Sequence, residues 1–213
     1  MLLYLARHAQ TASSAVDSFN GQRELPLTET GLAQAKLLGL RLAGIRWAAV
    51  YRSPLGRTRQ TAALIAPGFD QVVLPGLTEI DYGGWEGLSP EQARALNPGR
   101  YKAWIADPAA TSPTGGETAA QVEVRVLAAL DEILSRHDGS AQPVLAVSHK
   151  ATLRILGARL TGAPISKYRV RWPQDECALN LIELRKGKEP FLRLWNDTSH
   201  LDKDPGASTR GGK

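Results

Sequence analysis

Short apolar runs alternate with segments of helical periodicity along the chain, and this alternation limits the possible folds more than any other feature. Each run stops at a charged or turn-forming residue, as a buried strand does. The clearest runs are residues 2–6, 48–52, 143–148 and 178–185. Residues 187–190 are predicted to form the turn of a terminal hairpin that joins 178–185 to 191–195. Strands that alternate with helices predict an α/β fold, a three-layer α/β/α sandwich with a mostly parallel central sheet.

The segments between these runs carry the start and stop signals of helices. Ser89 and Gln92 have the spacing of a capping box, and Pro98 after Asn97 is predicted to end the short helix that they begin. The predicted helices cover 28–43, 89–97, 117–137 and a segment from about residue 151. At 28–43 and 117–137, apolar residues recur at spacings of three and four, which indicates helices that pack one face on a sheet.

Length and composition indicate one globular domain. The chain has 213 residues, of which 43% are hydrophobic and 22% charged, and it is long enough to bury a full core. We therefore expect a single domain over residues 1–200. After Leu201 no apolar residue is larger than alanine, so 201–213 is predicted to be a disordered tail.

Charge and hydropathy patterns exclude several partners. The formal net charge is +5, but the basic residues are scattered and form no run of like charges, so we expect no nucleic-acid partner. The N-terminus turns polar after six residues, and no apolar run approaches the roughly 20 residues of a membrane span. Cys177 is the single cysteine, which excludes an intrachain disulfide. We expect a cytoplasmic protein without a membrane segment.

Two histidines follow predicted strands at equivalent places. His8 comes directly after the run 2–6 and its neighbour Arg7, and His149 follows 143–148 and opens a helix. Ligands of open α/β sheets bind at the carboxyl ends of strands, and a helix N-terminus favours an anion. The helix after 48–52 carries Arg57 and Arg59; one of the two could clamp a phosphate, or both could be solvated surface arginines.

A loop at 77–87 carries three carboxylates among apolar and glycine residues, namely Glu79, Asp81 and Glu86. Such a setting can raise the pKa of one carboxyl enough for a general acid. A surface charge is the plainer interpretation of any one of them.

Taken in order and spacing, these motifs resemble the histidine phosphatase superfamily, the phosphoglycerate mutase-like group. The segments that carry the resemblance are 7–11 (RHAQT), 19–28, 53–62, 77–87, 114–118 and 147–150. The resemblance as a whole covers nearly all of residues 2–185. The resemblance implies the phosphoglycerate mutase-like fold and a phosphoryl transfer through histidine.

The resemblance also implies roles for five residues. His8 would be the nucleophile that forms a phosphohistidine. Arg7 and Arg57 would hold the phosphoryl oxygens, and His149 would complete that pocket. Glu79 would protonate the leaving alcohol.

Further positions match the family or depart from it. Gln10 and Thr11 would lie beside the pocket, and Gly21 matches the glycine of a family loop. Ser14 stands where many members carry an asparagine that helps to hold the phosphate. Lys150 replaces a common glycine; it would either point to solvent or reach a second anionic group of the substrate.

We therefore predict a phosphatase that acts on a small phosphorylated metabolite. Arginines and a histidine can supply the charge that magnesium supplies in kinases, so we expect no metal ion and no cofactor. Only 35 positions separate Glu79 from Thr114, which leaves little room for the long lid of a mutase. A phosphoglycerate mutase-type phosphotransferase and a non-catalytic binding module are the alternatives, and a homodimer stays open.

Overall fold

A mixed six-stranded sheet forms the centre of the molecule in the computed structural model, which describes residues 1–14 and 18–203. The strand order is β3-β2-β4-β1-β5-β6. The strands are β1 (Leu2–Arg7), β2 (Ala49–Arg52), β3 (Gln71–Val73), β4 (Val144–Ser148), β5 (Leu179–Glu183) and β6 (Phe191–Asp197). β3, β2, β4 and β1 are parallel to one another, and β5 and β6 add an antiparallel hairpin. The predicted fold class and terminal hairpin are confirmed, whereas β3 was not predicted.

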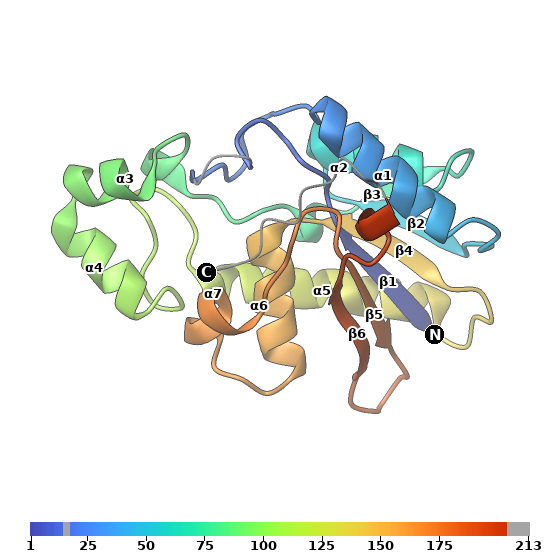
Figure 1. Cartoon of the computed structure of the whole chain (residues 1–213). Coiled ribbons are helices and arrows are strands. Elements are labelled where there is room, and N and C mark those ends of the chain that lie inside the picture. The colour runs from blue at the N-terminus through green and yellow to red at the C-terminus, as the bar shows by residue number, and fades with distance from the viewer. Residues whose placement is uncertain (15–17, 204–213) are drawn as a thin grey trace.

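Helices cover both faces of this sheet (Figure 1). They are α1 (Glu29–Arg41), α2 (Gly56–Ile65), α3 (Pro90–Leu96), α4 (Pro98–Ala106), α5 (Ala119–His137), α6 (Lys150–Leu160) and α7 (Tyr168–Arg171). On one face, Leu38 of α1 and Val50 of β2 belong to a single buried cluster. On the other face, Ile133 of α5 and Leu156 of α6 pack against the sheet. Two apolar cores on opposite faces are what a three-layer sandwich requires.

The register of the parallel strands fixes where the chain leaves the sheet. Arg7 of β1 lies opposite Ser148 of β4, and β2 pairs in parallel with the other side of β4. The first residues after these strands, His8, Ser53 and His149, therefore emerge at the same edge. Predicted strand ends that are far apart in sequence meet there.

α3 and α4 form a small cap beside the sheet (Figure 1). The cap has an aromatic cluster of its own, in which Trp85 and Trp104 are buried. The prediction that Pro98 stops the helix over 89–97 is incomplete. Asn97 ends α3 and also begins α4, because its side chain accepts a hydrogen bond from the Arg100 amide while Pro98 takes the first helical position.

The C-terminal boundary differs slightly from the expected one. Leu201–Lys203 form a short 3-10 turn, and the rest of the predicted tail lies outside the described residues.

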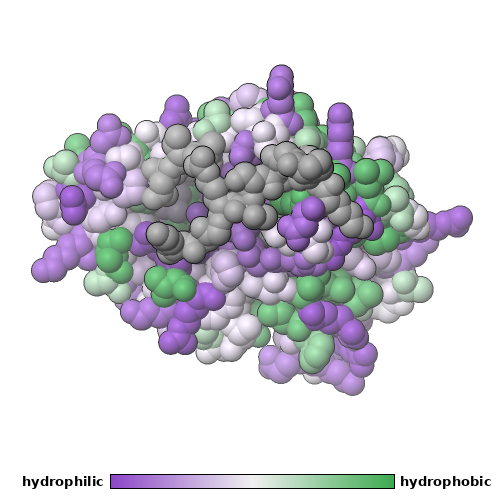
Figure 2. Space-filling model, viewed as in Figure 1, coloured by the Kyte–Doolittle hydropathy of each residue, from purple (hydrophilic) through white to green (hydrophobic). Residues whose placement is uncertain are grey.

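Among the helices of the described chain, none is long and apolar enough to cross a membrane. On the face shown in Figure 2, hydrophobic residues occur in groups interspersed with hydrophilic side chains.

Candidate active site

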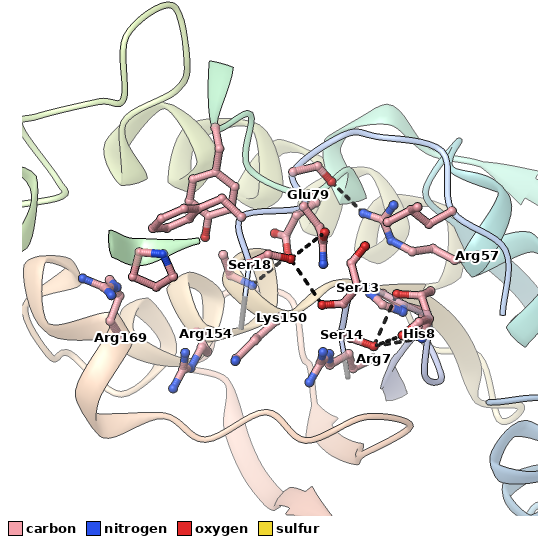
Figure 3. Close-up of a pocket in the computed structure, with 18 of the residues that line it drawn as sticks. Arg7, His8, Ser13, Ser14, Ser18, Arg57, Glu79, Lys150, Arg154 and Arg169 are labelled. Carbon is pink, nitrogen blue, oxygen red and sulfur yellow. Dashed lines mark hydrogen bonds between the residues drawn. The ribbon is translucent and has the colours of Figure 1, made fainter. Parts of the chain in front are cut away.

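A pocket of about 400 Å³ opens at the edge of the sheet where β1, β2 and β4 end. Most of the residues predicted for the site line it, and Figure 3 labels several of them. The predicted residues that line it are Arg7, His8, Thr11, Ser14, Gly21, Arg57, Glu79 and Lys150. The loops after three strands and the start of two helices thus converge on one concave surface.

The imidazole of His8 is held in one tautomer. Its Nδ1 lies 2.8 Å from the carbonyl oxygen of Ala9, and because a carbonyl only accepts, Nδ1 must donate. In the neutral ring the lone pair is then on Nε2. Burial, followed by the charges of Arg7 and Arg57, holds the pKa of His8 well below 6.5. A neutral imidazole with a free Nε2 is suited to act as a nucleophile.

Arg7 precedes His8 and lines the same pocket. One terminal nitrogen donates to the carbonyl of Gln174 at 2.7 Å. Its Nε is buried and has no hydrogen-bond partner within residues 1–14 and 18–203. Burial lowers the pKa of this guanidinium from 12.5, yet a guanidinium keeps its charge in proteins. Arg7 therefore presents a positive charge and an unused donor beside the nucleophile.

Arg57 lies at the start of α2 and is buried. Its Nε donates to Nδ1 of His149 at 3.1 Å, and its terminal nitrogens donate to the carbonyls of Gly21 at 2.7 Å and Arg23 at 2.8 Å. These bonds orient the guanidinium and tie it to the loop before α1. Burial also lowers the pKa of Arg57 from 12.5.

His149 lies behind Arg57 and is not among the residues that line the pocket. Because Nδ1 accepts from Arg57, Nε2 carries the ring proton and donates to the Ser53 hydroxyl at 2.7 Å. Burial and the charge of Arg57 hold the pKa of His149 well below 6.5, so the ring is neutral. Its ring centroid lies 5.1 Å from that of His8. Ser53 was not predicted, although it too follows a strand directly.

Glu79 occupies the N-terminus of α6. Its Oε1 accepts hydrogen bonds from the amides of Ile80 at 2.9 Å and Thr152 at 3.1 Å, while the nearby Thr152 hydroxyl donates its one hydrogen to the Thr78 carbonyl at 2.7 Å. Its Oε2 accepts one, from the Ala151 amide at 3.1 Å. The helix end that we expected to hold a substrate anion thus holds a carboxylate of the protein itself. Of the three loop carboxylates, Glu79 lines the pocket, and Asp81 and Glu86 do not.

An arginine that the sequence analysis did not identify, Arg125, fixes the loop of Glu79. Arg125 of α5 donates to the carbonyls of Thr78 at 2.6 Å and Glu79 at 3.1 Å. It also forms an ion pair with Glu117 at 2.9 Å, and Glu117 accepts from the amide of Asp81 at 3.0 Å. The periodicity of α5 marks Arg125 only as a charge on a helix, so no sequence signal identified it.

The remaining predicted binding residues have different positions. The Ser14 hydroxyl accepts from the Thr11 amide at 2.8 Å and donates to the Thr11 carbonyl at 3.0 Å, which closes a turn at the pocket. Gly21 has φ +49°, and a Cβ there would lie 1.9 Å from a carboxylate oxygen of Glu86. Gln10 is not among the lining residues, because its side chain accepts from the Thr28 hydroxyl at 2.8 Å and supports the start of α1.

No group of three or more His, Cys, Asp or Glu side chains that could hold a metal ion occurs in the part of the chain that the structure describes. Arg7 and Arg57 place positive charge in the pocket. A histidine with a free Nε2, in a pocket that two arginines and a buried glutamate also line, is an arrangement suited to phosphoryl transfer.

The comparisons with known proteins agree with this class. The family model described as histidine phosphatase superfamily (branch 1) matches residues 3–198. The chain is 33% identical to phosphoserine phosphatase 1 of Hydrogenobacter thermophilus over 93% of each chain. It is 34% identical to the probable phosphoglycerate mutase GpmB of Yersinia pestis over 94% of each chain. Other relatives are named as phosphatases.

Solved structures are similar over the same range. YhfR of Bacillus stearothermophilus superposes with a TM-score of 0.86 at 29% identity, covering 93% of this chain and 98% of that one. The chain belongs to the histidine phosphatase superfamily. Within it, the chain is a phosphatase-type member of the phosphoglycerate mutase-like group, a phosphomonoester hydrolase.

Proposed function

We propose that the chain hydrolyses small phosphomonoesters in two steps through a phosphohistidine on His8, without a metal ion. One observation carries the proposal: Nε2 of a neutral His8 is free, in a pocket that Arg7 and Arg57 also line. Both arginines would bind the nonbridging oxygens of the phosphoryl group. Their charge would offset the charge that develops there during transfer.

In the first step, Nε2 of His8 forms a bond to phosphorus while the bond from phosphorus to the ester oxygen breaks. Glu79 gives a proton to that oxygen, so that an alcohol leaves. The proposal assigns this proton to Oε2, because Oε1 already accepts hydrogen bonds from two amides and Oε2 from one. Arg125 would act as a positioning residue, since it holds the backbone on either side of Glu79.

In the second step, a water molecule attacks phosphorus and the bond from phosphorus to Nε2 breaks. Glu79, now a carboxylate, takes a proton from the water. Inorganic phosphate leaves, and His8 and Glu79 return to their starting states. The two steps need no group that the chain does not supply.

Trapping the intermediate tests this proposal. We expect rapid acid-free quenching with a radiolabelled phosphomonoester to leave one acid-labile, base-stable phosphoryl group on the chain, and none on the His8→Ala variant. EDTA should leave the rate unchanged, and vanadate should inhibit. A phosphoryl group on another residue, or a rate that depends on added magnesium, contradicts the proposal.

A mutase activity is the second candidate, since one relative carries that name. A mutase returns the phosphoryl group to its product, whereas a phosphatase gives it to water. Incubation with 3-phosphoglycerate should therefore release inorganic phosphate without forming 2-phosphoglycerate. Isomerisation faster than phosphate release would favour the mutase.

A further inference from the structure

Three basic side chains extend the pocket beyond the phosphoryl group. Lys150 and Arg154 come from α6, and Arg169 comes from α7; all three line the pocket. Figure 3 shows them in a row that continues from Arg7. We call Arg7, His8 and Arg57 the inner wall, and Lys150, Arg154 and Arg169 the outer wall.

The charges of the pocket do not balance with a simple phosphomonoester. Five arginines and lysines line it, and Glu79 is the one acidic residue among the described residues that do. Among the lining residues, a dianionic phosphoryl group and the one carboxylate carry three negative charges against five positive ones. Neither Arg154 nor Arg169 forms a salt bridge with a carboxylate of the described chain. A pocket with this surplus attracts a ligand that carries more than one anionic group.

The two arginines of the outer wall are held in place. Nε of Arg154 donates to the carbonyl of Trp172 at 2.5 Å, which fixes the guanidinium and leaves its terminal nitrogens for other partners. The guanidinium of Arg169 lies over the ring of Trp104, 4.0 Å from the centroid. Stacking of this kind reduces the entropy that a side chain loses when it binds a ligand.

The neighbouring phenols add donors without adding negative charge. Tyr82 and Tyr168 line the same pocket. Burial raises the pKa of Tyr168 to about 12 and that of Tyr82 well above 10. Both hydroxyls stay protonated at neutral pH, so they do not offset the charge of the outer wall.

We propose that Arg154 and Arg169, with Lys150 beside them, form a second anion subsite that selects phosphomonoesters whose alcohol part carries a carboxylate or a second phosphate. The inference rests on the proposed function, because the inner wall must bind the phosphoryl group for the alcohol part to face the outer wall. Guanidinium groups bind either anion through paired donors.

A purely structural role for Arg169 is the competing explanation. Its stacking on Trp104 joins α7 to the cap formed by α3 and α4, so a substitution could act by loosening the cap. A looser cap would weaken the binding of every phosphomonoester alike. Loss of an anion contact would weaken only the binding of esters that carry a second charge. The two explanations therefore differ in a ratio of KM values rather than in a rate.

The experiment uses pairs of esters that differ in one charge. Phosphate esters of ω-hydroxycarboxylic acids with two to six carbons are compared with the corresponding carboxamides. Bisphosphates of diols of matching length then show whether a carboxylate or a second phosphate is preferred. For the best chain length we expect the KM of the charged ester to lie at least about fivefold below that of its carboxamide. Arg154→Gln and Arg169→Gln should each remove most of this preference.

Matched variants separate charge from packing. Arg171→Gln alters an exposed arginine on the same short helix that does not line the pocket, and it should keep the preference. Arg154→Lys keeps the charge and should retain part of it. The KM values of the charged ester and its carboxamide are measured on the same preparation of each variant. Partial unfolding therefore affects both values equally and cancels in their ratio.

The outcomes also separate this inference from the proposed function. Two results would overturn the second subsite alone. In one, the carboxamides are hydrolysed and no charged ester is preferred. In the other, the preference survives in the double variant that combines Arg154→Gln with Arg169→Gln. If no ester is hydrolysed, the proposed function fails. Calorimetric binding then decides the inference, and equal affinities for the acid and carboxamide esters overturn it too.

Discussion

At the inner wall, Arg57 is 2% exposed and is held by three hydrogen bonds, to one histidine and two backbone carbonyls, which leave two of its five N–H donors for a ligand. At the outer wall, by contrast, Lys150 is exposed and Arg154 and Arg169 are half-buried. The inner wall comes from strand ends in register, and the outer wall from helices that pack outside the sheet. A site built this way can hold the phosphoryl group rigidly and bind the variable alcohol part less tightly. Substitutions at the two walls should therefore differ in size and in selectivity.

The largest effect is expected at the nucleophile. His8→Ala should lower kcat for every phosphomonoester at least about 10⁴-fold, because no other side chain can take over a covalent step. Steady-state rates with an aryl phosphate measure this. His137→Gln is the control, since His137 interacts with Tyr51 and does not line the pocket. Activity of His8→Ala within a few-fold of the parent would remove the inner wall from the chemistry.

Glu79→Gln should give the next largest effect, and it should depend on the leaving group. For alkyl phosphates we expect a loss of about 10² to 10⁴ in kcat, and a much smaller loss for aryl phosphates that leave without protonation. Glu86→Gln, in the same loop but outside the pocket lining, should leave the alkyl to aryl ratio unchanged. Equal losses on both ester types with Glu79→Gln would make this residue structural.

Acid should destabilise the fold through its buried neutral histidines, one of which, His8, belongs to the inner wall. Burial lowers the pKa of His8 and His149 well below 6.5 and that of His200 to about 4. In the unfolded chain these rings titrate near 6.5, so below that pH the unfolded state binds more protons. The free energy of unfolding should fall below pH 6.5 by about 1.4 kcal/mol per pH unit for each such ring, until its folded pKa is reached.

Urea unfolding at pH 7.0, 6.0 and 5.0 measures this loss. Above pH 6.5 these three rings should add no further pH dependence. His200→Asn should reduce the slope without a change in the preference for charged esters. A free energy of unfolding that stays constant between pH 7.0 and 5.0 would mean that the rings are not buried as neutral groups.

The two walls also differ in how far the sequence predicts them. His8 and His149 could be placed together because parallel strands end at one edge of a sheet, a rule that holds whatever packs around them. The same rule brings the helix after β2 to this edge, but the choice of Arg57 over Arg59 came from the resemblance to the family. The carboxylate of Glu79 could be named but not located, since a loop reaches α6 only through hydrogen bonds to amides 72 and 73 positions away.

At the outer wall, Lys150 could be named from the sequence, but Arg154 and Arg169 carry no comparable signal. Arg154 appears in the sequence as one more polar position of a helix, and Arg169 lies on a helix of four residues. Their place at the pocket depends on how α7 docks beside the cap, and the cap itself was missed because Pro98 was interpreted as a stop. Tertiary packing, which local sequence patterns do not encode, decides both the docking of α7 and the formation of the cap.

Lys150 gives the smallest expected effect and the sharpest test of the outer wall. It is exposed and lies at the first position of α6, directly after His149, so its stem can follow the pocket rim while the ammonium stays near water. A contact of this kind contributes no more than about 1 kcal/mol, which corresponds to roughly fivefold in KM. Lys150→Met keeps the length of the stem and removes the charge, so the KM for the best charged ester should rise up to about fivefold relative to its carboxamide.

Raising the salt concentration from 0.02 to 0.5 M should reduce the effect, because the screening length falls below about 10 Å above 0.1 M. Arg159→Gln, an exposed change on the same helix that does not line the pocket, should leave the ratio unaltered. If Lys150→Met and Arg159→Gln give the same ratio at low salt, the second subsite consists of the two arginines alone, and Lys150 belongs to the solvated surface.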